Sequence, residues 1–233
     1  MKAAFLLAMN ACRAERRGCV LVSELATGAQ RFVRDDEVAL DPLAEVLAER
    51  LRLGKSGMVE HAGAEIFLDV HVPPVRLIAI GAVHISQALA PLAKIAGFDM
   101  VVIDPRTAFA NDERFPDVQV IAEWPDVALP PMKLDRYTAM AFLTHDPKID
   151  DPALEQALRA ECFYLGALGS RKTHGKRVER LSAKGFSPEQ IGRIHAPIGL
   201  DIGAVSPSEI AISIVGEIIA SLRKKPLRAE KGA

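Results

Sequence analysis

A glycine turn followed by an acidic residue one strand later is the first pattern in the chain with the chemistry to bind a ligand. Gly81-Ala82-Val83-His84 follows a short apolar run, and Asp104 closes the next apolar run. In dinucleotide-binding folds such a turn opens a helix whose free N–H groups bind phosphate, while the acidic residue bonds a ribose hydroxyl. The pattern predicts ligand contacts from Gly81, Ala82 and His84, with Asp104 as an acceptor.

The turn departs from the usual three-glycine pattern at two positions. Val83 stands where a glycine lets pyrophosphate approach the backbone, and Ser86 stands where a glycine allows close helix–sheet packing. The context therefore predicts a Rossmann-type fold but disfavours ordinary NAD(P) binding. An NAD(P)-dependent oxidoreductase or a nucleotide-binding regulator remains the alternative function. Catalytic residues stay unassigned, because no convincing base completes an active site.

Cations near two further strand ends favour a phosphorylated ligand. Arg106 follows Asp104 closely, and Gly169-Ser170-Arg171 lies between a predicted strand and a predicted helix. A hydroxyl and a guanidinium at a helix N-terminus form a credible anion site. From Arg171 to Arg193 there are seven Lys and Arg against two Glu. The alternatives are a solvated loop arginine and a solvated basic helix face.

Three other polar residues have both a functional and a structural interpretation. Asp201, in a glycine-flanked loop, is a candidate acceptor for ligand N–H groups or the cap of a turn. His145 with Asp146 has the chemistry for proton transfer, yet Asp146-Pro147 is equally a helix start. A histidine at a helix start, such as His84, is often structural.

Alternating strands and helices are expected to position these residues. Apolar runs predict strands, and helical spacing predicts the helices between them. The predicted strands are 76–81, 100–104, 118–122, 138–144 and 163–168, and the predicted helices are 85–96, 152–161 and 172–184. Ser206-Pro207-Ser208-Glu209 opens a last helix with a capping box. Repeated strand–helix units predict a parallel sheet covered by helices on both faces.

The first part of the chain has a different pattern. Hairpins are predicted around Thr27-Gly28 and Ala62-Gly63, and Asp41-Pro42 is expected to start a helix that ends at Gly54. Pro73-Pro74 marks the boundary. The α/β chain is thus expected to have a small N-terminal α+β domain (1–72), a Rossmann-like domain (75–225) and a flexible basic tail (226–233).

Composition narrows the class of protein. The 233 residues carry a net charge of -1, with 49% hydrophobic and 5% aromatic residues, which argues against disorder and against a nucleic-acid partner. Three scattered cysteines predict neither a disulfide framework nor a metal site. No run approaches the ~18 apolar residues of a membrane span, and Arg13, Arg16 and Arg17 oppose export of the short apolar start. A cytoplasmic location is expected.

The chain resembles the XdhC/CoxI family of molybdenum hydroxylase maturation factors over about residues 73–222. Five segments carry the resemblance. They are LIAIGAVHISQAL (77–89), VIDPRTAFANDERFP (102–116), LTHDPKIDDPAL (143–154), YLGALGSR (164–171) and PIGLDIGAVSPSEIAISIVGE (197–217).

The resemblance implies an accessory protein rather than an enzyme. Its cargo would be the molybdenum cofactor, a molybdopterin bearing molybdenum, delivered in sulfurated form to apo-xanthine dehydrogenase or a related hydroxylase. A sulfurating desulfurase is an implied second partner, and a homodimer is compatible with the apolar last helix. The phosphate of molybdopterin fits the basic surplus after Ser170.

Two departures from the family pattern matter. Gly81-Ala82-Val83-His84 replaces a common Gly-Ala-Gly-His, and the front of the chain has Arg17-Gly18-Cys19-Val20-Leu21 where many members have Gly-Gly-Cys-Val-Glu. This disfavours cofactor ligation by a cysteine. A C-terminal-type member with a reduced front domain is expected.

Overall fold

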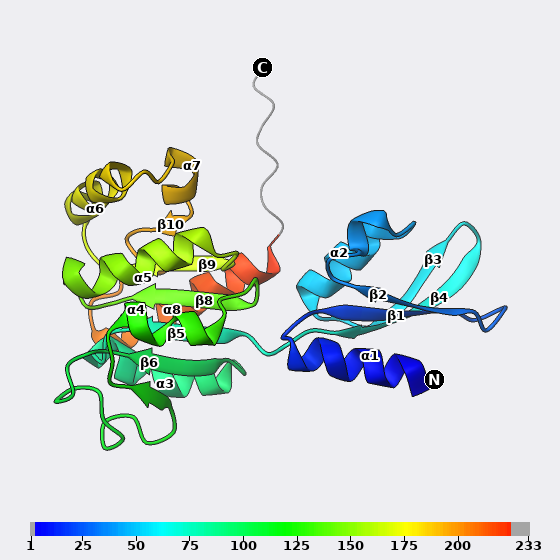
Figure 1. Cartoon of the computed structure of the whole chain (residues 1–233), viewed down its shortest axis with the longest axis horizontal. Coiled ribbons are helices and arrows are strands. Elements are labelled where there is room, and N and C mark those ends of the chain that lie inside the picture. Colours follow the sequence, from blue (N-terminus) through cyan, green and yellow to red (C-terminus); the bar gives the residue numbers. More distant parts are fainter. Residues whose placement is uncertain (1–2, 225–233) are drawn as a thin grey trace. The chain divides into compact units, whose positions relative to one another are not determined.

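The computed structural model describes residues 3–224, and the chain forms two compact units, Met1–Pro73 and Pro74–Ala233 (Figure 1). The tail predicted at 226–233 lies outside the described residues. Each unit has its own sheet and its own apolar core. Within residues 3–224, no helix is both long and apolar enough to cross a membrane.

The first unit is built on a four-stranded antiparallel sheet in the order β2-β1-β4-β3. Its elements are α1 (Ala3–Ala14), β1 (Cys19–Glu24), β2 (Gln30–Arg34), a 3-10 turn (Val38–Leu40), α2 (Ala44–Leu53), β3 (Gly57–His61) and β4 (Ala64–His71). Both predicted hairpins are confirmed. Alternate strand residues such as Val20 and Leu68 pack with Leu47 of α2 in the core.

The start of α2 differs from the prediction. The helix begins at Ala44 rather than at Asp41-Pro42, and its N-cap is Leu43. Asp41 instead accepts a hydrogen bond from the Leu43 amide at 2.8 Å, which closes a turn ahead of the helix. The predicted end is right, because Gly54 caps α2 in the left-handed conformation that glycine adopts without strain.

The second unit alternates strands and helices as predicted. Its strands are β5 (Arg76–Ile80), β6 (Asp99–Ile103), β7 (Gln119–Ile121), β8 (Thr138–Phe142), β9 (Tyr164–Ala167) and β10 (Ile194–His195). Its helices are α3 (His84–Ile95), α4 (Pro125–Ala128), a 3-10 turn (Pro130–Met132), α5 (Pro147–Arg159), α6 (Arg171–Ala183), α7 (Pro188–Ile191) and α8 (Pro207–Arg223). The sheet is parallel throughout.

The strand order β10-β9-β8-β5-β6-β7 is that of a doubly wound Rossmann sheet. β5 and β8 are neighbours, and the chain moves outward from them in opposite directions. The crevice at the carboxyl ends of such a central pair is where open α/β sheets bind ligands. The topology therefore directs attention to the loops that follow β5 and β8.

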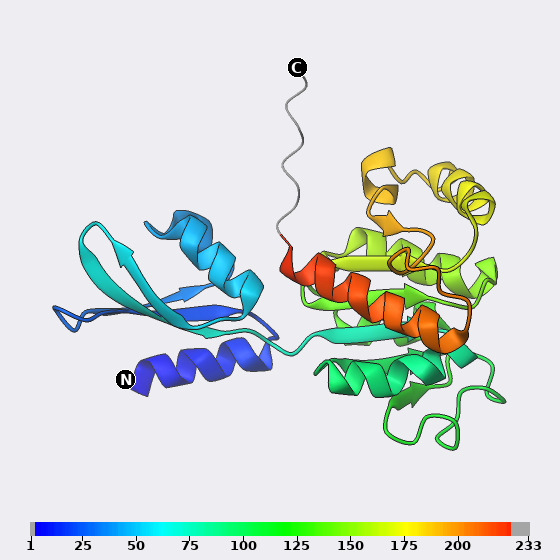
Figure 2. The same cartoon turned by 180° about the vertical axis from the view of Figure 1, so that it is seen from behind.

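Helices cover both faces of this sheet, as the sequence predicts (Figures 1 and 2). Leu77 and Ala79 of β5 pack on the face that α3 and α8 cover, while Ile78 and Ile80 pack on the face of α4, α5 and α6. Residues on a strand point alternately to the two faces, so a strand buried on both is apolar throughout. That is why β5 is a continuous apolar run.

Helix α5 starts five residues earlier than the predicted helix at 152–161. Asp146 is its N-cap and accepts a hydrogen bond from the Lys148 amide at 2.9 Å, with Pro147 at the first helical position. Pro152 lies inside the helix at the cost of one backbone hydrogen bond. The helix-start alternative for Asp146-Pro147 is thus confirmed, and the predicted start at Pro152 is wrong.

The capping box of α8 gives a test of local stability. Ser206 accepts from the Glu209 amide at 3.3 Å, and the Glu209 carboxylate accepts from the Ser206 amide at 2.9 Å. Ser206→Ala removes one of these bonds and should lower the free energy of unfolding by about 1 kcal/mol in urea titration. Ser208→Ala, on the exposed first turn, should change it by much less; equal losses would contradict a capping role.

Candidate functional site at the carboxyl edge of the parallel sheet

The predicted ligand-binding residues all lie at the carboxyl edge of the parallel sheet. They follow four different strands: Gly81, Ala82 and His84 follow β5, Asp104 and Arg106 follow β6, Ser170 and Arg171 follow β9, and Asp201 follows β10. Parallel strands bring their carboxyl ends to one edge, which explains why positions distant in sequence lie along it.

The glycine turn after β5 is held by packing as well as by conformation. Gly81 has a φ of +114°, and a Cβ atom there would lie 2.7 Å from the Cγ2 atom of Thr144, beyond the end of β8. The turn therefore requires glycine whether or not a ligand is bound. His84 is exposed at the first turn of α3, and Val83, the N-cap, has no capping hydrogen bond from its side chain.

Asp104 lies beneath this turn with no exposed surface. One oxygen accepts from the Ala82 amide at 2.8 Å and from Arg106 Nη2 at 2.6 Å, while the other accepts from the Arg106 amide and Nε, both at 2.9 Å. Burial acts to raise the pKa of Asp104, but these hydrogen bonds outweigh it and lower that pKa. The carboxylate is thus engaged within the protein, and the group facing solvent is Arg106.

Arg106 has 39% of its side chain exposed, and its guanidinium lies 4.9 Å from the ring centroid of Phe109. Its hydrogen bonds to Asp104 raise its pKa, which keeps it charged. Arg114, a residue that sequence reasoning missed, binds the carbonyl oxygens of Ala82 and Phe109 at 2.8 and 3.0 Å. The loop after β6 is therefore fastened to the glycine turn by Arg114, while Arg106 is held through Asp104, which also binds the Ala82 amide.

Ser170 and Arg171 lie farther along the same edge. Ser170 is the N-cap of α6 and accepts from the Thr173 amide at 3.2 Å. Arg171, the first residue of α6, is exposed, and its side chain has no hydrogen bond or ion pair with any described residue. With adjacent strands ~4.8 Å apart, β9 lies about 10 Å from β5. Asp201 is exposed in the loop between β10 and α8.

The loop after β8 lies between these two groups and contacts a buried acid in the first turn of α5. Thr144 donates to Asp150 Oδ1 at 2.7 Å, and Asp150 is 2% exposed. Burial raises the pKa of Asp150 to about 6, although the Thr144 hydrogen bond and the Arg177 charge act against the shift. The same threonine that packs under Gly81 thus also holds this carboxyl group.

A second polar network, also missed from the sequence, connects the edge to α8. Glu217 accepts from Tyr164 Oη at 2.5 Å and from the Gly199 amide at 2.8 Å, and it bonds His195 Nδ1 at 3.0 Å. Burial acts to raise the pKa of Glu217, but these bonds outweigh it and lower the pKa. The carboxylate anchors the loop that leads to Asp201.

The cysteines do not supply a reactive thiolate. Cys12, Cys19 and Cys162 are buried and not bonded to one another by disulfides. Burial raises the pKa of Cys162 to about 12, and burial together with the Cys12 thiol does the same for Cys19. Across residues 3–224, no three His, Cys, Asp or Glu side chains are placed to hold a metal ion.

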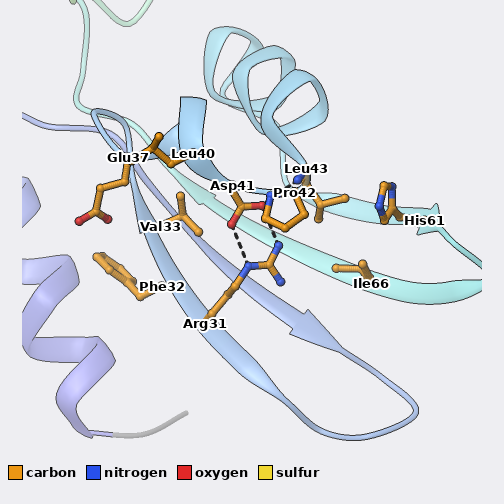
Figure 3. A pocket seen from close by; sticks show the side chains of 10 residues that line it. All are labelled: Arg31, Phe32, Val33, Glu37, Leu40, Asp41, Pro42, Leu43, His61 and Ile66. Carbon is orange, nitrogen blue, oxygen red and sulfur yellow. Dashed lines mark hydrogen bonds and ion pairs between the residues drawn. The ribbon is translucent and has the colours of Figure 1, made fainter.

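A hollow of about 470 Å³ lies in the first unit beside β2 (Figure 3). Its wall is mainly apolar and includes Phe32 and Ile66. Arg31 donates to both oxygens of Asp41 at 2.8 Å, so these two charges neutralise each other. The hollow therefore offers apolar surface, whereas the edge of the parallel sheet offers exposed cations.

The family model that describes the XdhC Rossmann domain matches residues 77–218. The chain belongs to the XdhC family. This match confirms the resemblance drawn from the five segments, and it includes every residue of the edge from Gly81 to Asp201. The Rossmann assignment is confirmed as well, by the family model and by the strand order.

Curated relatives match this XdhC-family chain over about two thirds of its length. The uncharacterized protein YqeB of Escherichia coli K12 is 34% identical, over 69% of this chain and 30% of YqeB. The molybdenum cofactor insertion chaperone PaoD of the same organism is also 34% identical, over 65% of this chain and 41% of PaoD. A probable xanthine dehydrogenase subunit of Bacillus subtilis 168 is 32% identical over 68% and 46%. The chain thus spans less than half the length of these relatives.

A solved structure resembles the whole chain. A crystal structure described as a xanthine dehydrogenase from Bacillus halodurans aligns with a TM-score of 0.66 and 24% identity, covering 98% of this chain and 66% of that one. At this identity the likeness concerns the fold. Both units therefore have counterparts in a known architecture.

The Asp104 cluster predicts a stability effect at the edge. Asp104→Asn replaces an acceptor by an N–H donor that faces Arg106, and it should lower the free energy of unfolding by about 2–3 kcal/mol in urea titration at pH 7. Because the pKa of Asp104 is lowered on folding, its contribution exists above the ordinary pKa and disappears on acidification. The matched control is Asp99→Asn, at the exposed start of β6. A similar loss in both variants would contradict this role.

Asp150 predicts the opposite pH dependence. Its pKa rises on folding to about 6, so the folded chain holds a proton that the unfolded chain has released between about pH 4 and 6. Stability should fall as pH rises through this window. Asp150→Asn should remove this fall. Its free energy of unfolding, measured by calorimetry, should therefore rise by roughly 2–3 kcal/mol relative to that of wild type as the pH goes from 4 to 7.5. Exposed Asp112→Asn should keep the wild-type profile; a fall that persists in Asp150→Asn would assign it to another group.

Proposed function

We propose that the chain binds the molybdenum cofactor as cargo and assists its insertion into a molybdenum hydroxylase of the xanthine dehydrogenase type. The observation that carries the proposal is the 34% identity with PaoD, whose name states insertion of this cofactor. The shared family domain also contains all the candidate ligands at the sheet edge. The chain would act as an accessory protein on the apo-hydroxylase, with a sulfurating desulfurase as a second partner.

The chemistry of the edge suits a phosphorylated pterin. Molybdopterin carries a phosphate, and its dinucleotide form carries a pyrophosphate. Arg106 and Arg171 present guanidinium groups, which bind phosphate oxygens in pairs, and the Gly81 turn and Ser170 stand at helix N-termini that favour anions. Phe109, 45% exposed beside Arg106, offers a flat surface for the pterin ring.

The carboxylates take different parts in this proposal. Asp201 is exposed and would accept from pterin N–H groups. Asp104, with all four hydrogen bonds made inside the protein, would act by fixing Arg106 and the Ala82 amide rather than by touching the cargo. The same bonds weigh against the rival NAD(P) function, because they leave no oxygen of Asp104 open to a ribose hydroxyl.

Ligand content tests the proposed function directly. The chain, purified from cells that make molybdopterin, is denatured and oxidised, and the fluorescent pterin is measured against protein concentration. Pterin in stoichiometric amount supports a cargo carrier. Absence of pterin together with tight NADPH binding in calorimetry would replace the proposal by its rival.

Arg171 gives a site-specific prediction. Arg171→Ala should weaken cofactor binding roughly tenfold to a hundredfold, because a charge-assisted bond to phosphate is lost. Arg171→Lys should recover only part of the affinity, since an ammonium lacks the planar pair of donors. Both variants should melt close to wild type, because Arg171 is exposed.

Lys184 at the opposite end of α6 provides the control. It is bound to Glu155 of α5, so Lys184→Ala removes an equal charge away from the predicted phosphate position. Affinity, measured by titration of the released cofactor, should change much less than in Arg171→Ala. Equal losses would show that a diffuse positive field attracts the cargo.

A further inference from the structure

A pocket of about 240 Å³ opens between α5 and α6, beside the loops that follow β8 and β9. Its walls include His145 and Asp150 on one side and Lys172, Lys176 and Arg177 of α6 on the other. None of these five belongs to the cofactor ligands predicted from the sequence. The pocket is therefore an additional feature of the carboxyl edge.

The pocket has a surplus of positive charge. Arg180, on its rim, is bound to Asp151 through two hydrogen bonds of 2.6 and 3.0 Å, so this pair is neutral. Lys172 and Lys176 make no hydrogen bond or ion pair with the part of the chain that the structure describes. They lie one turn apart on α6 and so face the same side of the helix. With Arg177 they set three cations against the single carboxylate of Asp150.

The buried guanidinium of Arg177 is the feature that indicates a ligand. It is 3% exposed, and its Nη2 donates to the Leu168 carbonyl oxygen at 2.9 Å, which fixes the guanidinium at the end of β9. Its Nε is buried and has no hydrogen-bond partner among residues 3–224. Burial lowers the pKa of Arg177, although the charges of Asp150 and Asp151 act against the shift.

A buried donor of a charged group without a partner is costly, so native proteins rarely keep one unless something else satisfies it. The nearby acids do not do so here, since Asp150 accepts from Thr144 and Asp151 pairs with Arg180. The N-terminal turn of α6 adds its own preference for negative charge at this place. An oxyanion in the pocket would compensate the guanidinium charge of Arg177 and bind both lysines together.

We propose that this pocket binds the phosphoryl group of a small organic phosphate monoester. Three cations match a dianion, and Arg177 supplies a donor held in a fixed orientation before the ligand arrives. The argument for the pocket uses only the residues that line it. It rests on the proposed function in one respect, that the cofactor's phosphate is named as one source of the phosphoryl group. Free phosphate is the other source.

Calorimetric titration of the full chain in low salt tests the pocket with two probes, phenyl phosphate and inorganic phosphate. Phenyl phosphate should bind at least as tightly as inorganic phosphate. Binding of inorganic phosphate alone would overturn the organic source, and binding of neither would overturn the pocket itself.

Paired lysine variants distinguish binding in the pocket from attraction by the overall positive charge of the protein surface. Lys172→Ala with Lys176→Ala should weaken phenyl phosphate roughly tenfold to a hundredfold, while both side chains are exposed and the fold is kept. The matched control is Lys94→Ala with Lys133→Ala, which removes the same charge from the end of α3 and from the segment before β8, both outside the pocket. Equal weakening in the two pairs would overturn the proposal.

Two further substitutions test the pocket without removing a positive charge. Arg177→Lys keeps the charge but removes the guanidinium donors, and it should still weaken binding, with folding checked by circular dichroism. Asp150→Asn removes the opposing charge and should strengthen binding several-fold at pH 7.5. A loss of affinity in Asp150→Asn would contradict the assignment.

The pocket and the proposed function can fail separately. Phenyl phosphate that competes with the purified cofactor would place the cargo's phosphate in the pocket. If the double variant Lys172→Ala with Lys176→Ala binds the cofactor as tightly as wild type does, the pocket is not the site of the cofactor's phosphate. The cargo role would then be unaffected. Phenyl phosphate binding in a chain that never carries pterin would keep the pocket and remove the cargo role.

Discussion

The buried carboxylate of Asp104 is the interaction on which the candidate site depends. It accepts hydrogen bonds from the turn after β5 and from the loop after β6, and so it ties these two segments together just beyond the backbone hydrogen bond from Gly81 to Ile103. Four donors converge on two oxygens, which makes the buried charge tolerable. Everything exposed around it, Arg106 above all, takes its position from this one group.

This arrangement gives the acidic residue at the end of β6 a different role from the one it has in dinucleotide-binding sites. In a dinucleotide-binding site the acid is a ligand for ribose, whereas here it is a support for an arginine. The group that faces solvent is therefore a cation rather than a carboxylate, which suits the anionic cargo of the proposed function better than a ribose hydroxyl. The fold is the same, and the chemistry is carried by the few residues grafted on it.

The sequence was informative where a pattern is local. Continuous apolar runs predicted β5 and β6 because strands buried on both faces need them, and the Ser206 capping box predicted the start of α8. It was less informative for β10, whose two residues are too short for any periodicity. For α5 the sequence offers two proline start signals, Asp146-Pro147 and Pro152, and only the structure shows that the first one begins the helix.

The site itself was predictable only as a set of positions along one edge. The role of Arg106 required its bond to Asp104 to be seen, and Arg114, Arg177 and Glu217 act through partners more than eight residues away or on other elements. A basic run in a sequence does not reveal which of its members is buried. Arg177 and the exposed Arg171 are equivalent in composition and opposite in environment.

The contact between Gly81 and Thr144 joins the two central strands of the sheet at their ends. A Cβ atom at position 81 has no room while a threonine methyl occupies position 144, and Thr144 in turn holds Asp150 through its hydroxyl. The evolutionary freedom of these positions is therefore shared. A smaller residue at the end of β8 would not by itself admit a larger one at the turn, because the backbone there has a φ of +114°. It would, however, remove the hydroxyl that the buried acid uses. The turn, the end of β8 and the start of α5 therefore constrain one another through three neighbouring residues.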